Sequence, residues 1–174
     1  MKMDIVANSG NDEFYTPRYA ITPIIKYLKA KDFKKIWCPF DTEDSIFVEV
    51  LTWEGFCVNF THIQNGEDFF NIKNLNCDCV VSNPPYSRKG EVIDRLFGLK
   101  VPFAMLVGVV GLFESQKRFS MFQSNEFEIL YFNKRISYLK DYLDSKPLIN
   151  PPFSSVYICS GVLPKQICFE RLDK

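Results

Sequence analysis

The chain has 174 residues, of which 47% are apolar and 16% aromatic, and this length is typical of one domain with its own core. Its 21 basic and 21 acidic side chains balance, which excludes a large basic platform for nucleic acid but allows a local basic rim. The charge-free run at residues 101–113 is too short for the roughly 20 apolar residues of a membrane-spanning helix. Residues 1–10 lack the apolar core of a signal peptide. We therefore expect one cytoplasmic domain over residues 1–174, with no membrane partner.

Apolar residues recur at helical spacing in some segments and form continuous apolar runs in others. The first part of the chain alternates the two patterns and predicts, in chain order, a helix at 16–28, a strand at 35–38, a helix at 42–55, strands at 57–63 and 77–82, a helix at 91–99, a strand at 103–109 and a helix at 113–122. Strands alone follow, at 127–132, 155–159 and 166–170. This order predicts an α/β fold with a Rossmann-like, doubly wound, mostly parallel sheet and an antiparallel C-terminal edge.

Local signals indicate where the first two helices begin. Thr16 is expected to cap the first helix, with Pro17 at its first position, because both residue types are common there. The second helix is expected to begin at Thr42, with Glu43 and Asp44 close to its positive end.

The six cysteines raise the question of disulfides or a metal site. Each lies in or beside an apolar run, and neither a Cys-x-x-Cys pair nor a second histidine beside His62 completes a four-ligand set. We therefore predict reduced, buried thiols and no metal site. The thiols are those of Cys38, Cys57, Cys77, Cys79, Cys159 and Cys168.

Unusual residues follow three of the predicted strands. They are Pro39-Phe40-Asp41, His62 with the downstream Asp68-Phe69, and Asn83-Pro84-Pro85-Tyr86. Ligands of open parallel sheets bind at the carboxyl ends of the strands. We therefore expect these residues to converge on one rim of the sheet.

The third of these segments carries the most specific chemistry. Two prolines end strand pairing and stiffen an extended turn, so its oxygens point outward. The side-chain oxygen of Asn83 and the carbonyl of Pro84 could then accept both hydrogens of one exocyclic amine and stabilise the charge that develops as it reacts. Tyr86 could stack on the ring of a base taken out of its helix.

Asn83-Pro84-Pro85-Tyr86 resembles the catalytic motif of the S-adenosylmethionine-dependent methyltransferases, of small phage or bacterial type, that modify the amino group of adenine. Phe14-Tyr15-Thr16-Pro17 is similar to the family's segment that contacts the methionine part of the cofactor, and Asp68-Phe69 resembles its motif for the cofactor adenine. The order of elements over about residues 14–159 also fits. The resemblance implies a class I methyltransferase fold, S-adenosyl-L-methionine as cofactor, and adenine in DNA or RNA as acceptor.

Two positions depart from the pattern of that family. Residues 38–45 contain no glycine, where the family usually has a glycine-rich turn, and they include Asp41, Glu43 and Asp44. These acids would repel a pyrophosphate, which argues against NAD or ATP, but they suit the ammonium, sulfonium and ribose hydroxyls of S-adenosyl-L-methionine. His62 stands where the family typically places an acid for the ribose, a role that Glu67 or Asp41 could take.

Few residues follow the helix near Phe122, and the sheet needs most of them, so no separate target-recognition domain is expected. A homodimer or a specificity partner could supply target selection. Basic residues flank the predicted site and are either phosphate contacts or ordinary solvated charges. They are Arg88, Lys89, Lys117, Arg118, Lys134 and Arg135, the last pair with Tyr138 as a possible stacking partner.

Each motif also has an interpretation without chemistry. The proline corner could be a plain loop exit, residues 68–70 a strand of buried aromatics, Phe14 and Tyr15 packing residues, and His62 an ordinary strand end. The competing hypothesis is a methyltransferase-like binding protein of phage or mobile-element type with weak or no catalysis, which the glycine-free turn favours. A nucleotide-sugar or phosphate-transferring enzyme is disfavoured because the chain lacks a phosphate loop.

Overall fold

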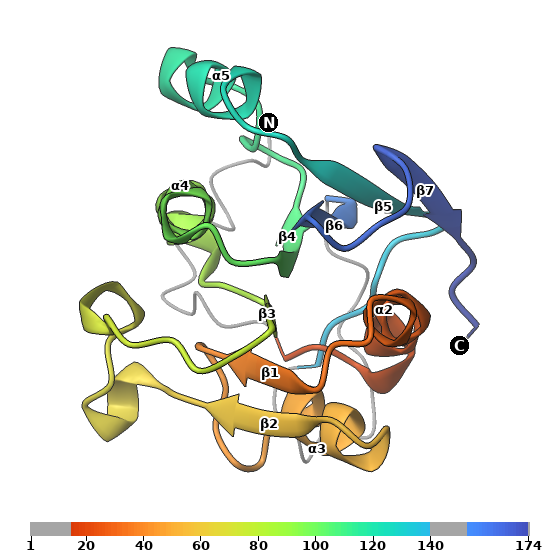
Figure 1. Cartoon of the computed structure of the whole chain (residues 1–174). Coiled ribbons are helices and arrows are strands. Elements are labelled where there is room, and N and C mark those ends of the chain that lie inside the picture. The colour runs from red at the N-terminus through yellow and green to blue at the C-terminus, as the bar shows by residue number, and fades with distance from the viewer. Residues whose placement is uncertain (1–14, 140–152, 174) are drawn as a thin grey trace.

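The computed structural model describes residues 15–139 and 153–173. They form a seven-stranded sheet in the order β2-β1-β3-β4-β6-β5-β7, with helices on both faces (Figure 1). The strands are β1 (Lys35–Cys38), β2 (Cys57–Phe60), β3 (Cys79–Ser82), β4 (Phe103–Gly108), β5 (Glu128–Phe132), β6 (Ser155–Ser160) and β7 (Ile167–Glu170). The α-helices are α2 (Arg18–Ala30), α3 (Ile46–Trp53), α4 (Lys89–Leu99) and α5 (Gln116–Gln123), and the 3-10 turns are η1 (Ile63–Asn65), η2 (Phe69–Asn71) and η3 (Tyr86–Arg88).

All strands except β6 run in the same direction. β1 pairs in parallel with β2 and β3, and β3 pairs in parallel with β4. β6 is antiparallel to both of its neighbours, β4 and β5, and β7 returns parallel to β5. The predicted Rossmann-like α/β class is confirmed, with the antiparallel strand placed between β4 and β5 in the C-terminal part of the sheet.

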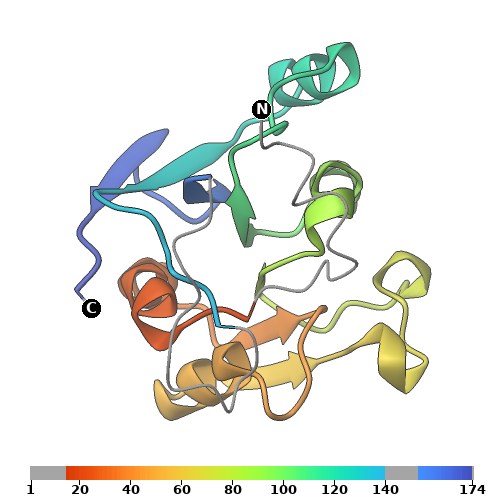
Figure 2. The same cartoon turned by 180° about the vertical axis from the view of Figure 1, so that it is seen from behind.

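Two cores fill the space between the sheet and its helices. Alternate strand residues face opposite sides, so Ile36 and Cys38 belong to one core and Trp37 to the other. Helices α2 and α3 cover the first side, while α4 and α5 cover the second, as the two opposite views show (Figures 1 and 2). The sheet is therefore buried on both faces, and ligands have access only at its ends and edges.

The predicted elements are all present, but several begin or end elsewhere. The N-cap of α2 is Pro17 without a side-chain bond, because the Thr16 hydroxyl accepts a hydrogen bond from Asn83 instead of capping the helix. Helix α3 begins four residues later than predicted, since Ser45 caps it by accepting from the amide of Phe47 at 3.3 Å.

Two strands are shorter than predicted. β2 ends at Phe60, and residues 63–65 form the turn η1 in place of a strand. β3 begins at Cys79, two residues later than the apolar run suggests, and all four of its residues are buried.

All six cysteines are free thiols, and burial is confirmed for four of them. Cys57 is exposed because it lies on the edge strand β2, and Cys77 is half-buried just before β3. Within residues 15–139 and 153–173, no group of three His, Cys, Asp or Glu side chains is placed to hold a metal ion. No helix in these ranges is long and apolar enough to cross a membrane.

Candidate functional site

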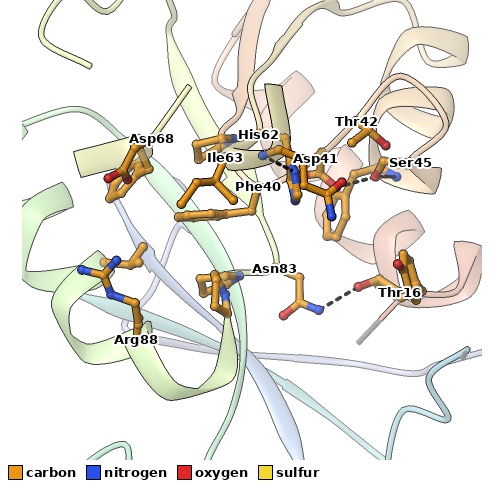
Figure 3. A pocket seen from close by; sticks show the side chains of 18 of the residues that line it. Thr16, Phe40, Asp41, Thr42, Ser45, His62, Ile63, Asp68, Asn83 and Arg88 are labelled. Carbon is orange, nitrogen blue, oxygen red and sulfur yellow. Dashed lines mark hydrogen bonds between the residues drawn. The ribbon is translucent and has the colours of Figure 1, made fainter. Parts of the chain in front are cut away.

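The order of the strands reverses between β1 and β3. From β1 the chain moves outward to β2, and it then returns past β1 to form β3 and β4. Such a reversal leaves a crevice beyond the carboxyl ends of the two central strands, where open sheets bind ligands. A pocket of about 250 Å³ lies there, lined by the segments that follow β1, β2 and β3 (Figure 3).

The turn after β1 forms one wall through Pro39, Phe40, Asp41 and Thr42. Asp41 is only 4% exposed although it borders the pocket. Burial raises the pKa of Asp41 to about 6, while hydrogen bonds from two serines and the charge of His62 act in the opposite direction. The site thus contains a buried carboxyl group that changes its charge close to neutral pH.

The two serines bond to different oxygens of the Asp41 carboxylate. Ser82, the last residue of β3, donates through Oγ to Oδ2 at 2.5 Å. Ser45, the cap of α3, donates to Oδ1 (Figure 3). Both serines are completely buried, so these bonds are shielded from water.

The segment after β2 forms the second wall. Nδ1 of His62 accepts from the amide of Gln64 at 3.2 Å and caps η1. Asp68 Oδ1 accepts from the amide of Phe70 at 3.0 Å and caps η2, which fixes the carboxylate on the pocket. Phe69 is 2% exposed, so it combines two proposed roles: it packs in the aromatic core and also borders the pocket.

The aromatic core around Phe69 positions this second wall. Its ring centroid lies 5.0 Å from that of Phe40 and 5.6 Å from that of Trp37 on β1. The indole of Trp37 donates to the hydroxyl of Thr61 at 3.0 Å, directly after β2. The turns after β1 and β2 are thereby packed against each other.

The proline corner forms the third wall, through Asn83, Pro84 and Pro85. Nδ2 of Asn83 donates to Oγ1 of Thr16 at 3.2 Å, which joins the corner to the segment before α2. Figure 3 shows Asp68 and Arg88 toward one end of the pocket and Thr16 toward the other, with the amide of Asn83 directed to Thr16. The corner therefore faces the same crevice as Asp41 and Asp68.

Tyr86 lies on the other side of the corner, beside a smaller cavity of about 10 Å³. Its ring centroid is 5.2 Å from that of Phe153, and the ammonium of Lys89 lies 3.8 Å from the ring centroid. Asn83 and Pro84 line both cavities, so they stand between the large pocket and the small one. A cavity of this volume holds about one water molecule, which is far less than a purine needs.

One predicted basic residue borders the large pocket. The guanidinium of Arg88 lies 4.0 Å from the ring centroid of Phe70, which also lines the pocket, and donates to Glu91 at 2.8 Å. Lys89 is 4% exposed and donates to the carbonyl of Val110 at 2.5 Å. Tyr138 is buried and donates to Ser155, which contradicts its predicted role as an exposed stacking residue beside Lys134 and Arg135.

Most residues that the sequence indicates for the site do line the large pocket. They are Tyr15, Thr16, Pro39, Phe40, Asp41, His62, Asp68, Phe69, Asn83, Pro84 and Pro85. Tyr86 lines the small cavity, Pro17 lines neither, and Phe14 lies outside the described residues. Sequence reasoning missed Ser45, Phe47, Ile63, Gln64 and Val92 as lining residues. Of these, Ser45 had a signal, since a serine before an apolar helical stripe is a common cap.

Comparisons with known proteins give weak likeness to solved structures and nothing more specific. No family model matches the chain, and no curated protein matches it significantly. Among solved structures, it is similar to a modification subunit of a putative type I restriction enzyme from Vibrio vulnificus YJ016, with a TM-score of 0.45 and 11% sequence identity. The match covers 89% of this chain and 46% of that subunit, so the chain spans less than half of that protein's length. At this identity the likeness concerns the arrangement of the sheet and its helices alone.

Proposed function

We propose that the protein is an S-adenosylmethionine-dependent methyltransferase that acts on the exocyclic amino group of adenine in DNA or RNA. The observation that carries this proposal is the position of the Asn83-Pro84-Pro85 corner. It borders the same pocket as Asp41 and Asp68, at the carboxyl ends of the two strands between which the sheet order reverses. An acceptor at the corner would thus meet a cofactor held by the first two turns.

The residues around the pocket fit the chemistry of the cofactor. Asp41, Asp44 and Asp68 bring carboxyl groups to a pocket that also contains the rings of Phe40 and Phe69. Carboxylates favour an ammonium and a sulfonium and accept hydrogen bonds from ribose hydroxyls, while aromatic rings cover an adenine. When bound, S-adenosyl-L-methionine supplies the methyl group on its sulfonium. The same carboxyl groups would repel the pyrophosphate of a dinucleotide.

Asn83 and Pro84 would hold the acceptor amine. The side-chain oxygen of Asn83 and the carbonyl of Pro84 would accept its two hydrogens and favour a tetrahedral nitrogen. The lone pair of this nitrogen would then form the new nitrogen–carbon bond, while the bond between the methyl carbon and sulfur breaks and leaves its electron pair on a neutral thioether. The developing positive charge on the amine is stabilised by these two oxygens, and its surplus proton is lost to water afterwards. Alignment at the corner supplies the rest of the acceleration.

The small cavity beside Tyr86 limits how an acceptor base could bind. Phe153 and Lys89 both contact the Tyr86 ring there, so an adenine can stack on Tyr86 only if one of them moves away. This closed state is the observation that favours a second candidate function, a methyltransferase-like binding protein without catalysis. The two candidates differ in whether a bound acceptor loses a proton and gains a methyl group.

The test measures cofactor binding and methyl transfer separately. Calorimetry with S-adenosyl-L-methionine should show binding to the parent and to Asn83→Ala, whereas transfer of labelled methyl groups to mixed DNA and RNA should occur only with the parent. Asn74→Ala, which changes an exposed asparagine away from the pocket, is the matched control. Binding without transfer in the parent would favour the binding protein, and full activity in Asn83→Ala would refute the role of the corner.

A further inference from the structure

The Asp41 carboxylate joins the two halves of the pocket. One of its oxygens is bonded by Ser45, the cap of helix α3, and the other by Ser82 at the end of β3. Asp41 itself follows β1, so the three side chains connect three different elements. Asp41 is 4% exposed and both serines are 0% exposed.

Burying this cluster costs free energy, because an ionised carboxylate loses its hydration when it enters the protein interior. Hydrogen bonds to an ionised oxygen are roughly twice as strong as those between neutral groups, and they strengthen further in a water-free environment. Two donors on one buried carboxylate therefore hold Ser45 and Ser82 at fixed positions relative to Asp41. These two bonds offset only part of the cost of burying the charge.

Ser82 is directly followed by Asn83, the residue proposed to hold the acceptor amine. The side chain of Ser82 points back to Asp41, and the next peptide begins the proline corner. The position of the backbone at residue 82 thus determines where the Asn83 side chain starts. On the other side, Ser45 fixes the first turn of α3 and with it the wall formed by residues 39–42.

We infer that Asp41 is a positioning residue that sets the catalytic corner relative to the cofactor wall, through Ser82 on one side and Ser45 on the other. This inference rests on the proposed function and goes beyond it, since it assigns Asp41 a second task besides facing the cofactor. It assigns a different role to each serine. Ser82 affects the rate of the methyl-transfer step, and Ser45 affects the affinity for the cofactor.

Ser82→Ala and Ser45→Ala form a matched pair, because each removes one hydrogen bond from the same carboxylate at a completely buried position. We expect Ser82→Ala to lower kcat about 10- to 100-fold at saturating cofactor, since small displacements of reacting groups have effects of this size. We expect Ser45→Ala to raise the KM for S-adenosyl-L-methionine and to change kcat by less than about threefold. Should Ser82→Ala not fold, Ser82→Cys keeps the shape with a weaker donor.

A second readout does not depend on activity. In protein labelled with ¹⁵N-asparagine, the side-chain amide signals of Asn83, assigned by their loss in Asn83→Ala, should shift in Ser82→Ala and stay in place in Ser45→Ala. Equal losses of kcat, no loss in either variant, or equal shifts of the Asn83 signals would overturn the inference. If the parent transfers no methyl group at all, the proposed function fails, and the Asn83 signals alone decide whether Asp41 positions the corner.

Discussion

Replacing Asp41 by asparagine should stabilise the folded protein at neutral pH while impairing the proposed reaction. Burial raises the pKa of this carboxyl from 3.8 to about 6, despite the opposing hydrogen bonds from Ser45 and Ser82 and the charge of His62. A rise of about two pKa units corresponds to ~3 kcal/mol of stability lost when the group ionises in the fold. Asparagine keeps the shape of the carboxyl group and carries no charge.

The sign of this stability change follows from which state, folded or unfolded, binds the Asp41 proton more tightly. The folded state holds the Asp41 proton up to pH about 6, and the unfolded chain loses it near pH 3.8. Well below pH 3.8 both states are protonated and the penalty is absent; it grows as the pH rises toward 6 and is complete above that value. The stability of Asp41→Asn relative to the parent should therefore increase by up to about 3 kcal/mol between pH 4 and pH 7.

Urea denaturation followed by circular dichroism at pH 4, 5, 6 and 7 measures this difference directly. Asp44→Asn, which removes an exposed carboxylate from the same turn, is the control for the loss of a charge at the surface. A constant difference for Asp41→Asn, or one that moves in favour of the parent as the pH rises, would refute the buried carboxyl as the cause. Activity should fall in the same variant, because asparagine replaces the carboxylate whose two oxygens accept from Ser45 and Ser82.

Three further changes test the walls of the two cavities. Gly108→Ala should destabilise the protein by about 1–3 kcal/mol in thermal or urea unfolding, since a Cβ there would lie 2.9 Å from ring atoms of both Tyr86 and Phe153. Tyr86→Ala should raise the acceptor KM and lower kcat in methyl-transfer assays but leave cofactor affinity unchanged in calorimetry, because Tyr86 does not line the large pocket. Arg88→Met should speed cofactor dissociation about two- to fivefold in stopped-flow measurements, because Arg88 and the ring of Phe70 that it contacts both line the pocket.

Two substitutions away from the site serve as controls for these experiments. Gly98→Ala lies in α4 with open space around the new Cβ, so it should be neutral or stabilise by about 0.5–1 kcal/mol. Arg171→Met removes an exposed cation far along the chain from the pocket and should leave cofactor dissociation unchanged. Destabilisation by Gly98→Ala equal to that of Gly108→Ala would contradict the steric argument for Gly108.

The fold and the convergence of the site residues on one pocket were predictable, because both follow from patterns among residues that are close in sequence. A buried apolar run followed by Asn83-Pro84 shows where β3 ends, and the carboxyl ends of parallel strands meet at one rim. The bonds that complete the site were not predictable, since they join residues distant in sequence. Ser82 and Asp41 are separated by 41 positions, and neither residue type alone indicates that the other is its partner.

The same limitation explains the incorrect detail at Thr16. A threonine before a proline and an apolar stripe is a good cap by local rules, yet its hydroxyl bonds to Asn83, 67 residues away. Tyr138 is a comparable case: the basic residues beside it suggest an exposed surface, but its hydroxyl bonds to Ser155 in the core. In both cases a tertiary contact took the side chain that a local pattern had assigned elsewhere.

The conformation of the turn after β1 shows whether its lack of glycine weakens the proposed function. A glycine is required where the backbone adopts a positive φ or where a side chain would fill the space of a ligand. Among the described residues, positive φ values occur at no position between 38 and 45, so the backbone of this turn needs no glycine. Nor does the Asp41 side chain close the pocket: it bonds to Ser45 and Ser82 inside the protein, and about 250 Å³ remain beside it. The glycine-free turn therefore gives no steric reason for the loss of a cofactor site, and the case for a binding protein without catalysis rests on the closed contact between Tyr86 and Phe153.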